Sequence, residues 1–241
     1  MTRSPIHDVG AAIGFLTVVG RSATPTAAAM SWFPVVGAVV GGAVGLAWWG
    51  AAEVWPPLLA AVVAIVVDLV LTGALHHDGL ADSADGLLPH MDRERRLDVM
   101  RQPDVGTFGA MALIATTAVR IGALSAVEPR PALLAGIWCA SRTVMATAAR
   151  RVPYARSRGL ATDFLGGSAV AVAVTGALLA GLLAIGSDGW IGVACLAAVA
   201  ICAAAVVALA MRRIGGFTGD VLGAAGLVGE TGALLAMAAR W

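Results

Sequence analysis

Hydrophobic residues form long uninterrupted runs in this chain, unlike the alternating or half-polar patterns of soluble strands and helices. Seven runs come close to the roughly 20 residues that a helix needs to cross a bilayer. They cover residues 33–52, 58–75, 109–127, 132–149, 169–186, 190–210 and 221–239. Gly and Ala crowd these runs, as expected where helices pack closely inside a membrane. The pattern predicts an all-α, polytopic membrane bundle of about six to seven transmembrane helices.

A shorter apolar run at residues 9–19 precedes these spans, and it is too short to cross a hydrocarbon core of about 30 Å. We expect a short N-terminal helix there, interfacial or re-entrant. A signal peptide is the alternative, with residues 26–30 as a loose cleavage region. No internal repeat or linker interrupts the chain, so residues 1–241 are expected to form a single membrane-embedded domain.

Composition agrees with a membrane protein and excludes one class of partner. Hydrophobic residues make up 59% and charged residues 13% of the chain, and the mean hydropathy is +0.86. A soluble domain carries about 25% charged residues. The net charge of +1 provides no basic surface for nucleic acid, so nucleic acid is not expected as a partner.

The distribution of arginine predicts the orientation in the membrane. All 16 basic residues are arginine. Twelve lie in the N-terminal segment and in the connections 76–108, 150–168 and 211–220, whereas the alternate connections and the C-terminus contain only Arg130 and Arg240. Because cytoplasmic loops are enriched in arginine and lysine, the first set is predicted to be cytoplasmic and Trp241 external.

Three aspartates, Asp78, Asp82 and Asp85, follow the second span at positions i, i+4 and i+7. At about 100° per residue, their side chains fall within an arc of about 60° on one helix face. Carboxylates this close repel one another, and a divalent cation removes that repulsion. Mg²⁺ accepts carboxylate and phosphate oxygens, so we interpret this face as a candidate magnesium site. The alternative is a solvated acidic helix end.

Four charged residues fall inside the predicted spans: Asp68, Arg120, Arg142 and Glu230. Each costs about 2.5–3.5 kcal/mol at a helix centre on insertion scales, so they are expected to pair or to line a wet cavity. Two acids and two bases fit mutual pairing. Substrate binding is the alternative role.

The stretch LTGALHHDGLADSADGL at residues 71–87 closely resembles the signature of the cobalamin synthase family, the adenosylcobinamide-GDP ribazoletransferases. Further resembling stretches are SWFPVVGAVVGG at 31–42, RRLDVMRQPDVGTFG at 95–109, SRTVMATAARRVPYARSRGL at 141–160 and GGFTGDVLGAAGLVGE at 215–230. Together they run through most of the chain.

The resemblance implies a Mg²⁺-dependent transferase of cobalamin biosynthesis. Such an enzyme transfers adenosylcobinamide phosphate from adenosylcobinamide-GDP to α-ribazole, or to its 5′-phosphate, and releases GMP. It implies a multi-pass protein of the bacterial inner membrane with a cytoplasmic active face. The lipid bilayer and other enzymes of nucleotide-loop assembly are the further partners that it implies.

The resemblance also implies roles for individual residues. His76 matches a G-x-L-H-x-D-G pattern and is expected to act as a general base or to orient a metal ligand. Asp82 is expected to be both catalytic and a metal ligand. The metal ligands are expected to be Asp78, Asp82, Asp85 and Asp220. The substrate-binding residues are expected to be Arg101, Gly106, Thr107, Arg142, Thr218 and Gly219.

Some of these positions have alternative interpretations. Arg101 is a candidate diphosphate clamp, although Gln102 and Asp104 depart from the family pattern R-D-x-R-x-G-x-x-G around it. Thr218 or Asp220 is also a candidate helix N-cap. Arg93 and Arg95, in the same loop as Arg101, are interpreted as charges of a solvated amphipathic helix that follows the positive-inside rule.

Two other function classes compete with this interpretation. A CDP-alcohol phosphotransferase of lipid synthesis carries D-G-x-x-A-R followed by a glycine and two more aspartates, and this chain lacks that arginine and that downstream pair. A small multi-pass transporter would use intramembrane charges as an ion path. The missing internal repeat and the acidic cluster at a membrane exit argue against it.

Overall fold

The described part of this computed structural model, residues 5–20, 26–156 and 166–240, is all-α and contains no β-strand. Arg3, Arg21, Arg158 and Trp241, on which part of the predicted topology depends, lie outside it. The elements are α1 (Pro5–Leu16), a 3-10 helix η1 (Ala29–Trp32), α2 (Phe33–Ala52), α3 (Pro57–Thr72), α4 (Leu75–Leu87), α5 (Arg93–Val99), α6 (Thr107–Ser125), α7 (Pro131–Arg151), α8 (Ala169–Ile214) and α9 (Gly219–Ala238).

The observed helices confirm the predicted bundle. Within the described residues, five helices are long and apolar enough to cross a membrane, and a bent pair formed by α3 and α4 supplies a sixth candidate. Pro34, Pro57 and Pro131 lie in the first turns of α2, α3 and α7, where the missing N–H of proline costs nothing. The boundaries of α2 coincide with the predicted 33–52 span.

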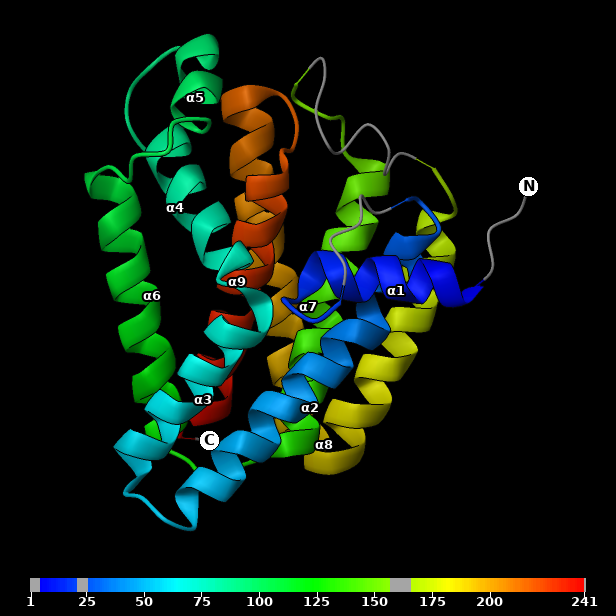
Figure 1. Ribbon diagram of the computed structural model, residues 1–241, viewed down its shortest axis with the longest axis vertical. Coiled ribbons are helices and arrows are strands. Elements are labelled where there is room, and N and C mark those ends of the chain that lie inside the picture. Colours follow the sequence, from blue (N-terminus) through cyan, green and yellow to red (C-terminus); the bar gives the residue numbers. More distant parts are fainter. Residues whose placement is uncertain (1–4, 21–25, 157–165, 241) are drawn as a thin grey trace.

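Helix α8 supplies two of the predicted spans. It is 46 residues long, and Gly189 interrupts it with the non-helical angles φ 53° and ψ −126°. Figure 1 shows the two arms of α8 on either side of this break running in opposite directions. Since only a glycine adopts such a backbone readily, the break separates the two predicted spans 169–186 and 190–210. With the two arms of α8 as separate spans, the number of candidate transmembrane spans in the described residues reaches the upper end of the predicted six to seven.

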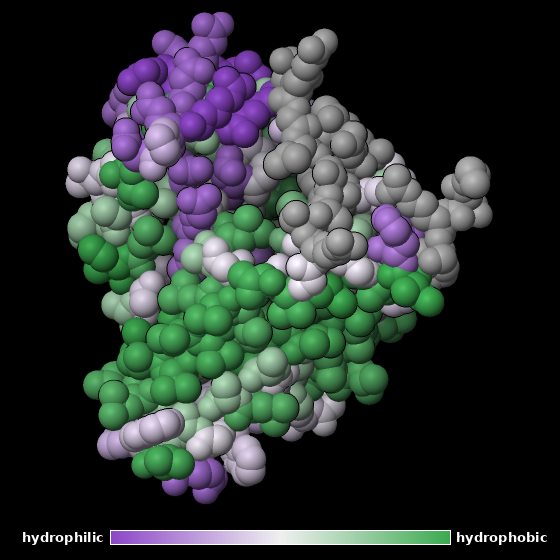
Figure 2. Space-filling view, in the orientation of Figure 1, coloured by the Kyte–Doolittle hydropathy of each residue, from purple (hydrophilic) through white to green (hydrophobic). Residues whose placement is uncertain are grey.

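One end of the bundle is hydrophilic. Figure 2 shows purple side chains gathered where Figure 1 places α5 and the upper part of α4, above a broad hydrophobic belt. The end of α7 and the start of α9 point toward this end, whereas the connections α2–α3 and α6–α7 lie at the other (Figure 1). Helix α1, the short apolar helix predicted near the N-terminus, lies crosswise to the long helices (Figure 1).

A sharp bend between α3 and α4 directs the chain out of the hydrophobic belt. The two helix axes differ by 89°. Gly73 and Ala74 both have φ 57° in the left-handed region, which glycine tolerates and alanine rarely adopts. We therefore assign α3 to the membrane and α4 to the hydrophilic end, where it packs against α6 and α9.

Close helix packing holds α2 against α7 in the membrane. A Cβ atom at Gly41 would lie 2.6 Å from the carbonyl oxygen of Leu134, and one at Gly45 would lie 2.6 Å from Cα of Pro131. These glycines lie four residues apart and face α7, which itself packs against α8 and α9. Small residues on one face allow the backbones to approach, as the composition of the spans predicts.

Candidate active site

The acidic stretch is helical, as predicted, and it lies beside the start of α9. Asp78, Asp82 and Asp85 are all in α4, and Asp220 is in the first turn of α9. A Cβ atom at Gly79 would lie 2.8 Å from the carbonyl oxygen of Asp220, so only glycine allows this approach. The fold therefore brings residues about 140 positions apart in sequence to one surface.

Asp82 experiences the combined charge of this surface. The pKa of Asp82 is raised to about 7, first by burial and then by the negative charges of Asp220 and Asp78. The guanidinium of Arg156 opposes this rise, and Asp85 adds a smaller one. The carboxylates therefore lie close enough to repel one another, as the helical-face argument expected.

The carboxylates are not already gathered around one point. Among the described residues, no three His, Cys, Asp or Glu side chains are placed to hold a single metal ion. Mg²⁺ is usually bound by one or two carboxylates, with waters and substrate phosphates in its other positions. The oxygen donors of Asp78, Asp82 and Asp220 are of the kind that this ion accepts. The metal-ligand assignments remain a prediction.

Asp85 has a structural role that the sequence pattern did not reveal. Its carboxylate accepts hydrogen bonds from the backbone N–H groups of Gly106, at 2.7 Å, and Gly109, at 2.9 Å. A carboxylate at the first turn of a helix satisfies unpaired N–H groups and interacts favourably with the helix dipole. Asp85 thus fixes the start of α6, and its remaining lone pairs are what a metal could use.

Thr218 caps α9, which agrees with the N-cap interpretation. Its hydroxyl accepts a hydrogen bond from the backbone N–H of Val221 at 3.2 Å and donates one to Oδ2 of Asp220 at 3.1 Å. Thr218 is fully buried. Gly219 is exposed, and a Cβ atom there would meet nothing within 4 Å. Of the two, Gly219 has room beside it for a substrate.

Arg156 joins the acidic surface, although its position in the connection 150–168 indicated only a loop charge. Its Nη2 atom lies 3.2 Å from Oδ2 of Asp220, and the same nitrogen donates a hydrogen bond to the carbonyl oxygen of Met100 at 3.3 Å. The available signal was its position inside the stretch SRTVMATAARRVPYARSRGL. Its partner, 64 residues further along the chain, could not be inferred from that position.

The other arginines of this end differ in their contacts. Arg101 and Thr107 are exposed, and within the described residues the guanidinium of Arg101 makes only a surface ion pair, with Asp98 at 3.5 Å. Arg101 is therefore free to bind an incoming anion. Arg93 is exposed, as its interpretation as a solvated charge predicts, and its guanidinium also donates to the carbonyl oxygens of Ile214, at 2.8 Å, and of Ala155, at 2.7 Å.

His76 and His77 are buried in the first turn of α4. Nε2 of His76 and both ring nitrogens of His77 have no hydrogen-bond partner among the described residues. His76 lies against α9, where a Cβ atom at Gly223 would be 3.8 Å from its Cδ2 atom. An unpartnered imidazole nitrogen retains the capacity to exchange a proton with a ligand. The catalytic role of His76 stays a prediction.

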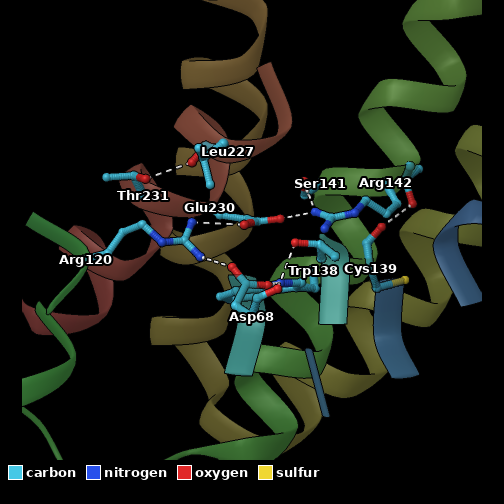
Figure 3. Close-up of polar contacts among 11 residues, drawn as sticks. Asp68, Arg120, Trp138, Cys139, Ser141, Arg142, Leu227, Glu230 and Thr231 are labelled. Atoms are coloured by element: carbon cyan, nitrogen blue, oxygen red, sulfur yellow. Dashed lines mark hydrogen bonds and ion pairs between the residues drawn. The ribbon is translucent and has the colours of Figure 1, made fainter. Parts of the chain in front are cut away.

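The four intramembrane charges form one buried network, which confirms their predicted pairing (Figure 3). Arg120 contacts Oδ2 of Asp68 at 2.8 Å and Oε2 of Glu230 at 3.0 Å. Arg142 pairs with Oε1 of the same glutamate. Trp138 donates its indole N–H to Oδ1 of Asp68 at 3.0 Å, and Arg120 lies over the ring of this tryptophan.

This network joins α3, α6, α7 and α9 and leaves Arg142 only 2% exposed. Its guanidinium is directed at Glu230 and at Oγ of Ser141 (Figure 3). Buried charges that are paired and hydrogen-bonded are the arrangement that a low-dielectric interior tolerates. Arg142 thus stabilises the interior of the bundle through these contacts. Its assignment to substrate binding is untested.

Comparison with known proteins identifies the family. Residues 8–238 match the family model described as cobalamin-5-phosphate synthase. The chain belongs to this family. Similar curated proteins named adenosylcobinamide-GDP ribazoletransferase come from Chlorobaculum parvum, 39% identical with 94% of this chain and 91% of the relative covered, and from Bradyrhizobium diazoefficiens, 38% identical with 98% and 95% covered.

A third relative of the same name, from Leptothrix cholodnii, is 36% identical over 84% of this chain and 81% of its own length. No solved structure matches. Membership of the cobalamin-5-phosphate synthase family confirms the resemblance seen in the motifs. It also decides against the lipid phosphotransferase and the transporter.

Proposed function

We propose that this chain transfers adenosylcobinamide phosphate from adenosylcobinamide-GDP to α-ribazole or its 5′-phosphate and releases GMP. The family membership of nearly the whole chain supports this reaction. The observation that carries it is the convergence of α4 and the start of α9, which places Asp78, Asp82 and Asp220 on one hydrophilic surface. A diphosphate brings negative charge to this surface, so the site requires a cation.

We propose Mg²⁺ as that cation, held by Asp82 together with Asp78 or Asp220. When bound, it would neutralise diphosphate charge and orient the phosphoryl group for in-line attack. The donor chemistry fits, because these side chains offer carboxylate oxygens, and the raised pKa of Asp82 supports a local negative charge that the protein does not fully compensate. Asp85 contributes by fixing the start of α6 beside them.

The remaining residues position the two substrates. The exposed guanidinium of Arg101 is proposed to bind the diphosphate, and the space beside Gly219 leaves room for a ligand at the start of α9. His76 is proposed to accept the proton of the attacking ribose hydroxyl, because its buried Nε2 atom has no partner among the described residues.

We propose that this surface faces the cytoplasm of a bacterial cell and that the protein lies in the inner membrane. The twelve-to-two distribution of loop arginines supports this orientation. A reporter fused after Trp241 should be active only outside the cytoplasm. Cytoplasmic activity at that position would contradict the proposed orientation of the C-terminus and would require one span fewer.

The decisive experiment measures GMP release from adenosylcobinamide-GDP in membranes that contain the protein. Parallel reactions with α-ribazole and with its 5′-phosphate identify the acceptor, and chelation of divalent cations followed by Mg²⁺ addition tests the metal. Asp82→Asn should abolish turnover. Asp92→Asn is the matched control, since Asp92 caps α5 away from this surface and asparagine also caps well. Equal loss in both variants would contradict the assignment of Asp82.

A further inference from the structure

Arg156 is held beside Asp220 by a short backbone pairing. The N–H of Ala155 donates to the carbonyl oxygen of Phe217 at 2.9 Å, and the N–H of Phe217 donates to that of Pro153 at 2.9 Å. The rings of Tyr154 and Phe217 pack together with their centroids 5.3 Å apart. These contacts fix the segment that carries Arg156 against the loop that leads into α9.

The guanidinium of Arg156 uses only part of its hydrogen-bonding capacity. It carries five N–H donors, and in the described residues only Nη2 has partners, at 3.2 Å and 3.3 Å. The first distance is at the long end of the usual range for N–H···O bonds, and the second lies just beyond it. Its Nε atom is buried and has no partner in the part of the chain that the structure describes. Nη1 is not among the buried atoms, and its two N–H donors have no partner in the described residues, so this side of the guanidinium is suited to a second anionic ligand.

The positive charge of Arg156 affects a second carboxylate besides its ion-pair partner Asp220. It acts on Asp82 as well as Asp220, so one guanidinium partly compensates both carboxylates. A divalent cation bound to the same carboxylates would supply that compensation more strongly and would repel the guanidinium. The diphosphate of a substrate would be the nearest new anion for it.

We propose that Arg156 is an exchangeable counter-ion: it pairs with Asp220 when no divalent cation is bound and binds the substrate diphosphate when the cation is present. This inference rests on the proposed metal site. Arginine suits both states, because its fork matches a carboxylate and a phosphate equally well, whereas lysine offers a point charge. Release of the ion pair frees Asp220 to ligate the metal.

The test measures binding rather than turnover. Mn²⁺ binding to the purified protein is followed by electron paramagnetic resonance, and adenosylcobinamide-GDP binding by equilibrium dialysis with Mn²⁺ present. Arg156→Gln should bind Mn²⁺ about tenfold more tightly, because a competing cation is removed, and adenosylcobinamide-GDP about tenfold more weakly. Adenosylcobinamide, which has no diphosphate, should bind Arg156→Gln and the wild type equally.

Arg151→Gln is the matched control, since Arg151 is an exposed arginine at the end of α7 and the change removes the same charge. It should alter neither affinity. Arg156→Lys keeps the charge, so it should bind Mn²⁺ like the wild type but adenosylcobinamide-GDP more weakly. This second variant provides the answer if Arg156→Gln does not fold.

Two results distinguish the failure of this inference from the failure of the proposed metal site. If the wild type binds no Mn²⁺, the metal site is wrong and the exchange falls with it. If the wild type binds Mn²⁺ but Arg156→Gln lowers the affinities for both Mn²⁺ and adenosylcobinamide-GDP, or changes neither, Arg156 is a structural clamp. The exchange alone is then overturned. Unchanged adenosylcobinamide-GDP binding by Arg156→Lys overturns it as well.

Discussion

Asp85 accepts a hydrogen bond from the backbone N–H of Gly106 at 2.7 Å and thereby connects the acidic helix α4 to the start of α6. The two residues belong to two separate family-resembling motifs, DGLADSADG and RQPDVGTFG. A Cβ atom at Gly106 would lie 2.5 Å from Oδ1 of Asp85, so the glycine is needed for room rather than for an unusual backbone angle. The motif glycine and the motif aspartate are one structural unit.

Gly106→Ala should therefore destabilise the protein, by about 1–3 kcal/mol, because the new methyl group overlaps the Asp85 carboxylate. Gly122→Ala in the same helix is the control. A Cβ atom at Gly122 would meet nothing within 4 Å, and alanine favours a helix, so this change should be neutral or slightly stabilising. Thermal unfolding in detergent measures both. Equal shifts would mean that the contact with Asp85 contributes little.

The bend between α3 and α4 holds one alanine in a strained backbone conformation. Ala74 has φ 57°, a conformation that costs an L-residue about 1 kcal/mol and glycine almost nothing. Ala74→Gly should thus leave the fold intact and raise the melting temperature. The matched change Ala110→Gly, inside α6, should lower it, because glycine weakens a helix interior. A lower melting temperature for Ala74→Gly would show that the alanine side chain contributes more than the strain costs.

The pKa of Asp82, about 7, predicts a pH dependence with a definite sign. A metal ligand must be deprotonated, so the apparent Mg²⁺ affinity should fall as the pH decreases through 7. The pKa of Asp82 in the folded protein is above the ordinary aspartate value of 3.8. Without metal, the folded protein therefore keeps a proton that the unfolded chain has lost, and its stability should decrease as the pH rises from about 4 to 7.

Calorimetric Mg²⁺ titrations and melting curves across this pH range test the two signs. In Asp82→Asn the pH dependence of stability in this window should shrink, since the titrating group is gone. An Mg²⁺ affinity that stays constant from about pH 6 to about pH 8 would place the metal away from Asp82.

The buried network predicts a large effect of a small change. Glu230→Gln leaves Arg120 and Arg142 with Asp68 as the only acid of the network, so it should destabilise the bundle by about 3–5 kcal/mol. Glu128→Gln, at an exposed glutamate, should change stability little. Melting temperatures in the same detergent give the comparison, and similar values for the two variants would contradict a structural role of the network.

The sequence predicted those features that follow from local pattern. The spans could be located because about 20 apolar residues in a row have few alternatives to a membrane helix. The boundaries of α2 show how well this works. Pairing of Asp68, Arg120, Arg142 and Glu230 was predictable from the cost of burying charge, but not that Glu230 would contact both arginines.

The remaining features depend on contacts between distant segments. Nothing in the spacing of Asp78, Asp82 and Asp85 shows that the third carboxylate caps α6 while the other two remain on the acidic surface. The partners of Arg93, Ala155 and Ile214, could not be inferred for the same reason, because they lie far along the chain. Helical periodicity gives the face on which a side chain lies, and tertiary packing decides what it meets there.

The buried network has a consequence for how the protein is made. During translation Asp68 enters the bilayer first, followed by Arg120 and Arg142, and Glu230 arrives with the last described helix. A nascent chain that has inserted α7 but not α9 therefore holds two arginines and one acid within the hydrocarbon. This excess positive charge is neutralised only when α9 docks, so completion of the bundle is coupled to synthesis of the helix that also brings Asp220 to the site.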